Sequence, residues 1–472
     1  MNVSPELYHL SAEELTQGYA RGDLSPLEVT KAVLARIESD GPDYNAFCLV
    51  DQEGALASAR QAEDRWRRGE PLGPIDGVPA TIKDLVLAKG WPTLRGSRTT
   101  DPAGPWDDDA PATDKLRQHG AVILGKTTTP EFGSKGVGES PLTGSTRNAW
   151  NIARTSGGSS GGAGTAAARG YGVLHIGTDG AGSVRIPASF NGIFGLKPTF
   201  GRVPAFPPSP LGTISHVGPM TRTVDDAARM MTVIAEPDRR DWRALPYDGR
   251  DYRNNLERSL DGLAIAYSPD LGYAAVEPGV AQACRRAADL LSQAGARVEE
   301  IEGPLGEDPV WITDRLWFAA FLRITDGMTA EQIGLMDPLL IAMLERARDL
   351  SLYDLVEAHK GRDDLALKLG AVHAQFDLLV TPTMPMTAFP AGPFNPWNTE
   401  RTEDWIRWSS FTYPFNLSQQ PAATCPCGFD ANGLPIGLQI VGPKYADHLV
   451  LQASRAFEAL APFPLPVRVR PG

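Results

Sequence analysis

Two glycine-rich turns carry serine residues, and a lysine lies upstream of both. Ser159 and Ser160 stand in the first turn, Ser183 stands in the second, and Lys83 ends a short apolar segment. Glycine turns let backbone N–H groups converge on one point, which an anion or oxyanion site requires. One Gly-Gly pair would be an ordinary turn. Two serine-bearing turns combined with a lysine indicate a reactive site.

The residues around Ser159 also match G-x-S-x-G, the nucleophile elbow of α/β-hydrolases. That elbow needs a strand directly before the serine, but residues 148–156 have the composition of a polar loop. It also needs an aspartate and then a histidine downstream. Of the seven histidines, only His448, beside Asp447, lies late enough in the chain. We therefore do not expect an α/β-hydrolase triad.

A serine nucleophile without a well-placed histidine needs another base. Burial lowers the pKa of an ammonium group because the charged form loses its hydration, so a buried lysine can accept a proton. Ser–Lys pairs are among the known variants of the catalytic triad. A lysine at a strand end is usually a solvated charge, so Lys83 alone would predict little.

The elements that must position these residues alternate between helix and strand. Ser11 and Ser25 each have the pattern that begins a helix. Further helices are expected at about 53–68, 115–119, 163–169, 223–235, 278–294, 403–411 and 446–459, and 308–370 is expected to be mainly helical. Strands are expected at 77–83, 121–125, 172–176, 263–267, 296–300, 376–381, 422–425 and 437–441, and loops at 92–113 and 202–222. This rhythm predicts α/β architecture with a parallel or mixed sheet, and no clean linker divides the chain. We expect a single large α/β/α domain over residues 1–472, with a central mixed β-sheet covered by helices.

Composition argues against several classes of protein. The 472 residues carry a net charge of −12 without a dense lysine or arginine cluster, so no nucleic-acid partner is expected. No stretch is apolar enough to span a membrane, and the acidic start lacks the pattern of a secretory signal. Cys425 and Cys427 stand too close for the usual zinc spacing, and no second pair accompanies them. We expect a cytoplasmic protein without a metal.

Several stretches that span most of the chain together resemble the amidase signature family of Ser–cis-Ser–Lys amide hydrolases. They are GVPATIKD (77–84), GKTTTPEFG (125–133), STRNAWN (145–151), TSGGSSGG (155–162), GTDGAGSVRIPASFNGIFGLKPTFGRV (177–203), LLVTPTMP (378–385), PFNLSQQPAATCPCG (414–428) and GLPIGLQIVG (433–442). The resemblance implies a catalytic core of about 61–204 plus 371–472. Residues 205–370 are the least diagnostic and are expected to form the substrate-specificity region.

By this resemblance Ser183 is the nucleophile, Ser159 is the bridging serine that follows a cis peptide bond, and Lys83 is the general base. Neutral Lys83 would take a proton through Ser159 from Ser183, whose Oγ attacks an amide carbonyl, and water would then release the acyl group. The implied reaction is hydrolysis of the C–N bond of a carboxylic amide without a cofactor. Aryl and apolar amides and carbamates are within the range of the family, and cleavage of an ester or a carbamate by this chain is left open at this point.

The resemblance also assigns an oxyanion hole and residues that support it. The backbone N–H groups implied are those of Gly180, Ala181, Gly182 and Ser183. Ala181 stands where the family often has glycine, and it would be strained if that position needed a positive φ. Thr178 and Asp179 are expected to support the turn through hydrogen bonds and Arg185 through an ion pair, whereas Ser160 is expected to be a structural hydroxyl.

The substrate is open at this point. The proline-rich segment 203–222 and the helical residues Trp311, Trp317 and Phe318 either wall a pocket for an apolar or aryl acyl group or belong to the core. A second function would use the same triad. It is that of the A subunit of a glutamyl-tRNA(Gln)/aspartyl-tRNA(Asn) amidotransferase, the glutaminase component that releases ammonia from glutamine. A catalytically silent binding protein would not need all three triad residues. We expect a small-molecule amide and water as reactants, and a homodimer as the assembly.

Overall fold

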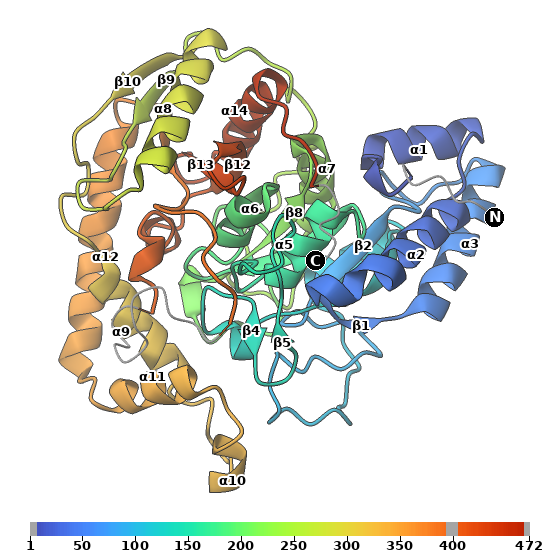
Figure 1. Ribbon diagram of the computed structural model, residues 1–472, viewed down its shortest axis with the longest axis horizontal. Coiled ribbons are helices and arrows are strands. Elements are labelled where there is room, and N and C mark those ends of the chain that lie inside the picture. The colour runs from blue at the N-terminus through green and yellow to red at the C-terminus, as the bar shows by residue number, and fades with distance from the viewer. Residues whose placement is uncertain (1–6, 393–404, 467–472) are drawn as a thin grey trace.

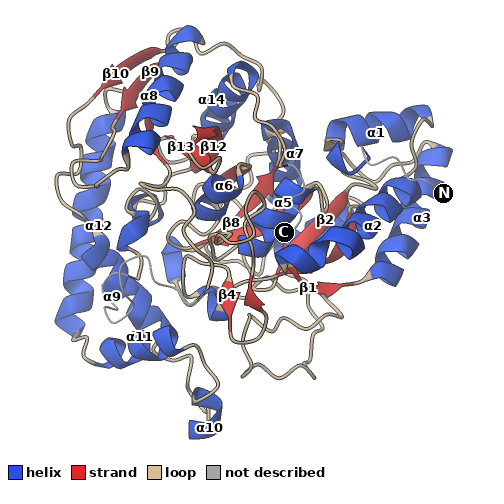
Figure 2. Ribbon diagram, viewed as in Figure 1, coloured by secondary structure: helices blue, strands red, loops and turns tan. Residues whose placement is uncertain are grey.

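A mixed eleven-stranded sheet flanked by helices organises the computed structural model, which describes residues 7–392 and 405–466 (Figures 1 and 2). In spatial order its strands are β1 (Phe47–Val50), β3 (Val122–Thr127), β2 (Pro79–Lys83), β6 (Leu174–Asp179), β8 (His216–Thr221), β7 (Phe194–Lys197), β12 (Ala422–Phe429), β13 (Pro435–Val441), β11 (Leu378–Pro382), β9 (Ala264–Tyr267) and β10 (Arg297–Glu300). Strands β3, β2 and β6 are parallel neighbours, as are β11, β9 and β10, and the strands between these groups pair antiparallel. The predicted α/β fold with a mixed sheet is confirmed.

The helices supply the outer layers. They are α1 (Ala12–Arg21), α2 (Pro26–Tyr44), α3 (Gln52–Arg68), α4 (Pro111–Gln118), α5 (Gly161–Arg169), α6 (Arg185–Asn191), α7 (Val224–Ile234), α8 (Pro278–Gln293), α9 (Val310–Phe321), α10 (Ala330–Ile333), α11 (Pro338–Arg348), α12 (Leu352–His373), α13 (Pro414–Leu417) and α14 (Asp447–Leu460). A separate two-stranded sheet pairs β4 (Glu139–Ser140) with β5 (Gly144–Ser145). Helix α1 begins with the expected capping box, in which Ser11 accepts from the Glu14 N–H.

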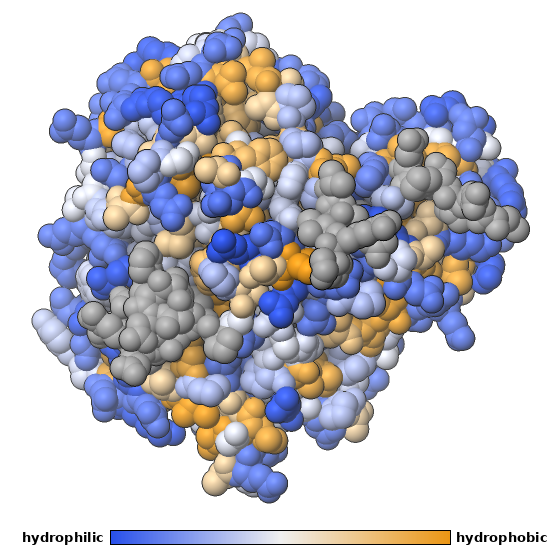
Figure 3. Space-filling model, viewed as in Figure 1, coloured by the Kyte–Doolittle hydropathy of each residue, from blue (hydrophilic) through white to orange (hydrophobic). Residues whose placement is uncertain are grey.

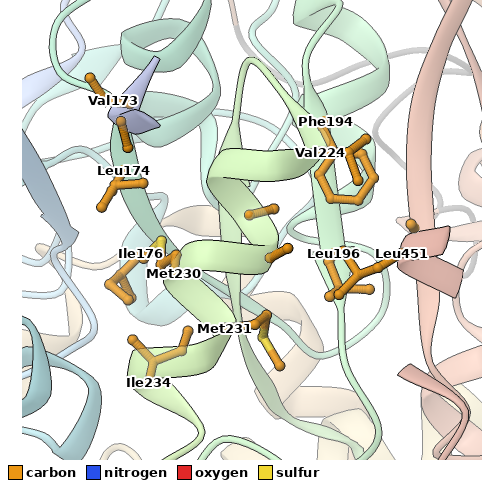
Figure 4. Close-up of a cluster of buried hydrophobic side chains, with 14 of the residues drawn as sticks. Val173, Leu174, Ile176, Phe194, Leu196, Val224, Met230, Met231, Ile234 and Leu451 are labelled. Atoms are coloured by element: carbon orange, nitrogen blue, oxygen red, sulfur yellow. The ribbon is translucent and has the colours of Figure 1, made fainter. Parts of the chain in front are cut away.

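One part of the main core lies between helix α7 and the strands behind it. Met230 and Ile234 of α7 point toward Leu174 and Ile176 of β6, and Leu196 of β7 lies on the other side of the helix in this view (Figure 4). All five side chains have no exposed surface. Burying an aliphatic side chain of this size stabilises a protein by about 1.5–3 kcal/mol, so this layer fixes the strand that leads into the second serine turn.

The prediction that residues 202–222 form a loop is wrong for their last part, because residues 216–221 form the buried strand β8 between β6 and β7. Gly218 and Pro219 suggest a break in the chain when read from sequence. In the structure a Cβ at Gly218 would lie 2.0 Å from the carbonyl oxygen of Leu196, so the glycine permits the close approach of this strand to its neighbour.

A helix is also predicted at about 403–411. Residues 403 and 404 lie outside the described residues, and for residues 405–411 the prediction is wrong. Residues 405–411 contain only the 3-10 turn Arg407–Ser409. Trp405 and Trp408 are both buried, and the Trp408 indole N–H donates to the Trp405 carbonyl oxygen at 2.9 Å. Tertiary packing of these aromatic rings therefore sets the local conformation.

The expectation of mainly helical structure over 308–370 is confirmed by α9 to α12, which follow one side of the molecule in Figure 1. These helices share a second hydrophobic cluster with residues 405–417.

Hydrophilic residues surround scattered hydrophobic ones on the face drawn in Figure 3. In residues 7–392 and 405–466, no helix combines the length and the apolar character that crossing a bilayer would take.

Candidate active site

Lys83 lies at the end of strand β2, every residue of which is buried. Its side chain has no exposed surface. The amine Nζ lies 2.6 Å from Ser159 Oγ, 2.9 Å from Ser160 Oγ and 2.8 Å from Thr178 Oγ1. The structure thus brings the predicted lysine and one predicted serine into direct contact.

Burial decides the charge state of this lysine. It lowers the pKa of the Lys83 amine well below its ordinary value, and the negative charge of Asp179 opposes that shift only in part. The hydroxyl groups around Nζ are neutral, so no carboxylate in this first ring of contacts holds the proton on the amine. A neutral amine of this kind can act as a base.

Ser160, expected to be a structural hydroxyl, also contacts the lysine. Its Oγ accepts from Lys83 and donates to the Thr178 carbonyl oxygen at 3.1 Å, while the Thr178 N–H donates back to it at 3.2 Å. Ser160 therefore links the lysine to β6. Sequence reasoning missed this contact, although adjacency to Ser159 was a signal for it.

Ser159 stands in the turn that leads into α5, and the peptide bond between Gly158 and Ser159 is cis. The serine is 2% exposed. A Cβ at Gly158 would lie 2.5 Å from the backbone of Val137, so only glycine fits this close approach.

Ser183 stands in the turn between β6 and α6, and its carbonyl oxygen accepts the Ser160 N–H at 3.1 Å. That bond ties the two serine turns together. Ser183 and Ser159 line the same cavity. In the described part of the chain, the Ser183 hydroxyl has no hydrogen-bond partner.

An ion pair between Asp179 and Arg185 braces the second turn. Arg185 Nε lies 2.9 Å from Asp179 Oδ2, and neither side chain is exposed. Asp179 also accepts the N–H groups of Gly182 and Val184, at 2.7 and 3.2 Å, and the side-chain amide of Asn416 at 2.9 Å. Although burial alone would raise the pKa of Asp179, the guanidinium of Arg185 holds it well below its usual range. This carboxylate therefore stays charged and holds the turn through its hydrogen bonds with the Gly182 and Val184 N–H groups.

The same contacts involve one of the four N–H groups expected to form the oxyanion hole. The Gly182 N–H donates to Asp179 Oδ1, so it is not free to bind an oxyanion. The N–H groups of Gly180, Ala181 and Ser183 have no partner among the described residues. Ala181 does not have a positive φ, whereas Gly182 has a φ of 126°, so the alanine is tolerated and the glycine takes the unusual conformation.

A cavity of about 320 Å³ opens beside the serines. Apolar side chains dominate its wall, including Leu85, Phe132, Trp317 and Phe321, and residues 204–211 complete it. No histidine is among its lining residues in the described ranges. His448, the residue that the α/β-hydrolase interpretation would need, is exposed instead.

The aromatic residues of α9 divide between wall and core. Trp317 lines the cavity, and Phe321 packs beside it with ring centroids 5.6 Å apart. Phe318 is buried in the second hydrophobic cluster, and Trp311 is 38% exposed. Of the three residues predicted as wall or core, only Trp317 is therefore in the wall.

Comparisons with known proteins agree with this geometry. The amidase family model matches residues 28–451. The chain is 36% identical to an acylamidase of Rhodococcus erythropolis, over 97% of this chain and 96% of that one. It is 32% identical to the glutamyl-tRNA(Gln) amidotransferase A-subunit of Chloroflexus aurantiacus, over 96% and 97% of the two chains. A solved bacterial aryl acylamidase of the amidase signature family superposes with a TM-score of 0.89 at 29% identity, over 96% of each chain. This chain belongs to the amidase family.

Proposed function

We propose that this amide hydrolase cleaves the C–N bond of a small carboxylic amide through an acyl-enzyme on Ser183. One observation carries the proposal: the buried amine of Lys83 lies 2.6 Å from Ser159 Oγ, at the edge of a cavity that Ser183 also lines. The family match and the acylamidase relative support the reaction class, which is hydrolysis of a carbon–nitrogen bond outside peptides.

Lys83, Ser159 and Ser183 would act as a proton relay. The neutral amine accepts a proton from Ser159, Ser159 accepts one from Ser183, and Ser183 Oγ attacks the amide carbonyl carbon. The proton then passes back along the relay to the nitrogen, the C–N bond breaks and the amine leaves. Water repeats the sequence on the ester and releases the acid. We infer that the contact between the two hydroxyls forms as substrate binds, because catalytic hydrogen bonds often tighten at that stage.

The tetrahedral intermediate would place its oxyanion on the free N–H groups of Gly180, Ala181 and Ser183. Loss of one such donor typically costs on the order of 100- to 1000-fold in turnover. Thr178, Asp179 and Arg185 support this arrangement: Thr178, which lines the cavity, holds the lysine, and the ion pair between Asp179 and Arg185 holds the turn from outside the cavity.

The substrate that fits best has an apolar or aryl group. A cavity of about 320 Å³ lies at the small end of the usual range for ligand sites. Its aromatic and aliphatic wall would lower the free energy of binding by removing apolar surface from water.

The glutaminase component of an amidotransferase is the alternative, supported by the similarity to such A-subunits. The apolar lining favours the amidase, since the side-chain amide of glutamine presents mostly polar surface. The two functions separate in one assay: the purified chain alone should hydrolyse acetanilide. Ammonia release from glutamine that required added partner subunits would support the alternative.

We further propose that the enzyme works in the cytoplasm as a homodimer, with water as the second reactant and no metal or other cofactor. Four free cysteines are consistent with a reducing compartment. Light scattering of the purified protein tests the assembly.

The acyl-enzyme can be trapped directly. Acid quenching during turnover of an anilide, followed by peptide mapping in a mass spectrometer, should locate the acyl group on Ser183. Ser183→Ala should fold normally and give neither adduct nor turnover, whereas Ser160→Ala should still acylate Ser183, more slowly. An adduct on Ser159, or retained turnover in Ser183→Ala, would contradict the assignment.

A further inference from the structure

One charged residue lines the catalytic cavity among the residues that the structure describes, and it is Arg95. It is half-buried beside Phe132, whose N–H donates to the Arg95 carbonyl oxygen at 2.8 Å. The proposed relay and oxyanion hole do not use this residue. The presence of a charged residue in a mainly apolar wall therefore needs another explanation.

The loop that carries Arg95 is fixed by a buried ion pair. Lys126 Nζ lies 2.9 Å from Asp84 Oδ1 and donates to Thr93 Oγ1 at 2.6 Å. The Gly96 N–H donates to the other oxygen of Asp84 at 3.3 Å. Arg95 itself has a φ of 58°, a left-handed conformation that is uncommon outside glycine and needs support from its surroundings. The guanidinium is thus carried by a rigid segment.

The charge of Arg95 is not matched within the protein. Its guanidinium donates to the Thr93 carbonyl oxygen at 3.3 Å, and no carboxylate of residues 7–392 or 405–466 lies within ion-pair distance of it. Asp84, the acid whose charge acts on it, is paired with Lys126. Burial lowers the pKa of Arg95, yet an arginine stays charged in a protein. A partly desolvated cation without a counter-charge is costly, and an anion would relieve that cost.

The rest of the wall offers Arg95 no counter-charge. None of the other described residues that line the cavity is acidic, and most of them are apolar. The wall therefore combines one unmatched cation with no acidic group, which favours a ligand that brings acceptor oxygens.

We propose that Arg95 binds a carboxylate on the substrate, so that the preferred substrates are amides whose apolar substituent carries an acidic group. A guanidinium presents several N–H donors in a planar fork that matches a carboxylate. The apolar wall holds the body of the substituent, and Arg95 selects its charged end. This inference rests on the proposed amidase function, because it assigns the specificity of the same cavity.

Matched substrate pairs test the inference. Acetanilide and 4-acetamidobenzoate differ by a carboxylate on the amine side, and butyranilide and succinanilic acid differ by one on the acyl side. The wild-type enzyme should prefer the acidic member of at least one pair in kcat/KM. Arg95→Gln should lower kcat/KM for the acidic member by about 10- to 100-fold, as expected for loss of a hydrogen bond to a charged group, and should lower kcat/KM for the neutral member far less. Arg95→Lys should keep part of the preference.

Arg98→Gln is the matched control, because Arg98 lies three residues further along the same loop, is exposed and does not line the cavity. It should leave both substrates unchanged. Equal losses for neutral and acidic substrates in Arg95→Gln, or no preference in the wild type, would overturn the inference while the amidase function stood.

Measurements of substrate binding test the role of Arg95 independently of turnover. Calorimetry on Ser183→Ala should give a lower Kd for the acidic member of the favoured pair, and adding Arg95→Gln should abolish the difference. Equal Kd values for acidic and neutral members in Ser183→Ala would also overturn it. Failure of the wild type to cleave any amide would instead contradict the proposed function.

Discussion

The side-chain amide of Asn416 donates to Asp179 at 2.9 Å, although 237 positions separate the two residues in the sequence. Asp179 also forms an ion pair with Arg185. The turn carrying Ser183 is thus held by a buried polar network from two distant parts of the chain. Networks of this kind are rigid when every member is satisfied and costly when one is lost.

Arg185→Gln should therefore remove both stability and activity. Breaking a buried ion pair by removing one partner typically costs about 3–5 kcal/mol, because the remaining charge is left unpaired. Urea unfolding measures that loss, and kcat/KM of the folded enzyme should also fall because the turn with Ser183 loosens.

Arg169→Gln provides the control for that experiment. Arg169 pairs with Asp40 at 2.7 Å, again with both side chains unexposed, but it does not line the catalytic cavity. It should cost similar stability and spare kcat/KM. Equal effects of the two variants on kcat/KM would show that the Asp179 network has no special role in the site.

Activity should depend on pH through Lys83. Because burial lowers the pKa of its amine, the neutral form that accepts a proton persists to lower pH than for an ordinary lysine. As pH falls through this lowered pKa, the amine becomes charged and kcat/KM should drop, and as pH rises it should reach a plateau. The measurement is a kcat/KM profile over the range where circular dichroism shows an intact fold.

His216, whose Nδ1 lies 3.1 Å from the Asp179 carbonyl oxygen, should not cause the acid limb of the profile, which is the loss of kcat/KM at low pH. Burial, and secondarily the charge of Lys197, lower the pKa of His216 well below its ordinary value, so His216→Gln should leave the position of the limb unchanged. A flat profile in the wild type would speak against a lysine base.

Phe321 should govern the preference for aryl acyl groups. It lines the cavity, whereas Phe318 on the same helix is equally buried in the cluster behind it. Phe321→Leu and Phe318→Leu should each cost about 1–2 kcal/mol of stability, since both remove similar buried volume. Only Phe321→Leu should lower the ratio of kcat/KM for a benzoyl anilide to that for an acetyl anilide. The same shift in both variants would assign the effect to helix packing instead.

The strand and the turns that carry the site could be predicted because their signals are local, whereas the roles of Lys83, Ser159 and Ser183 were inferred from the family resemblance. The apolar run before Lys83 indicated a buried strand end, and glycines around Ser159 and Ser183 marked the two turns. The capping pattern at Ser11 likewise predicted a helix start from four neighbouring residues. Such features depend on short-range geometry, which sequence spacing reports well.

The rest depends on contacts that spacing does not report. The use of the Gly182 N–H by Asp179 follows from the side-chain conformation of the acid, and the role of Asn416 follows from how the chain returns to the site. Strand β8 was missed because Gly218 and Pro219 favour turns in isolation, while pairing on both sides holds them extended. The division of the catalytic core from a specificity region over 205–370 stays a prediction.

The proton relay is tested most directly by single-turnover acylation of Lys83→Ala with two substrates that share an acyl group, an anilide and a 4-nitrophenyl ester. The relay must protonate a departing amine, whereas nitrophenolate leaves without a proton. The account predicts that the anilide rate falls far more than the ester rate. An unchanged anilide rate, or equal losses on both substrates, would contradict it.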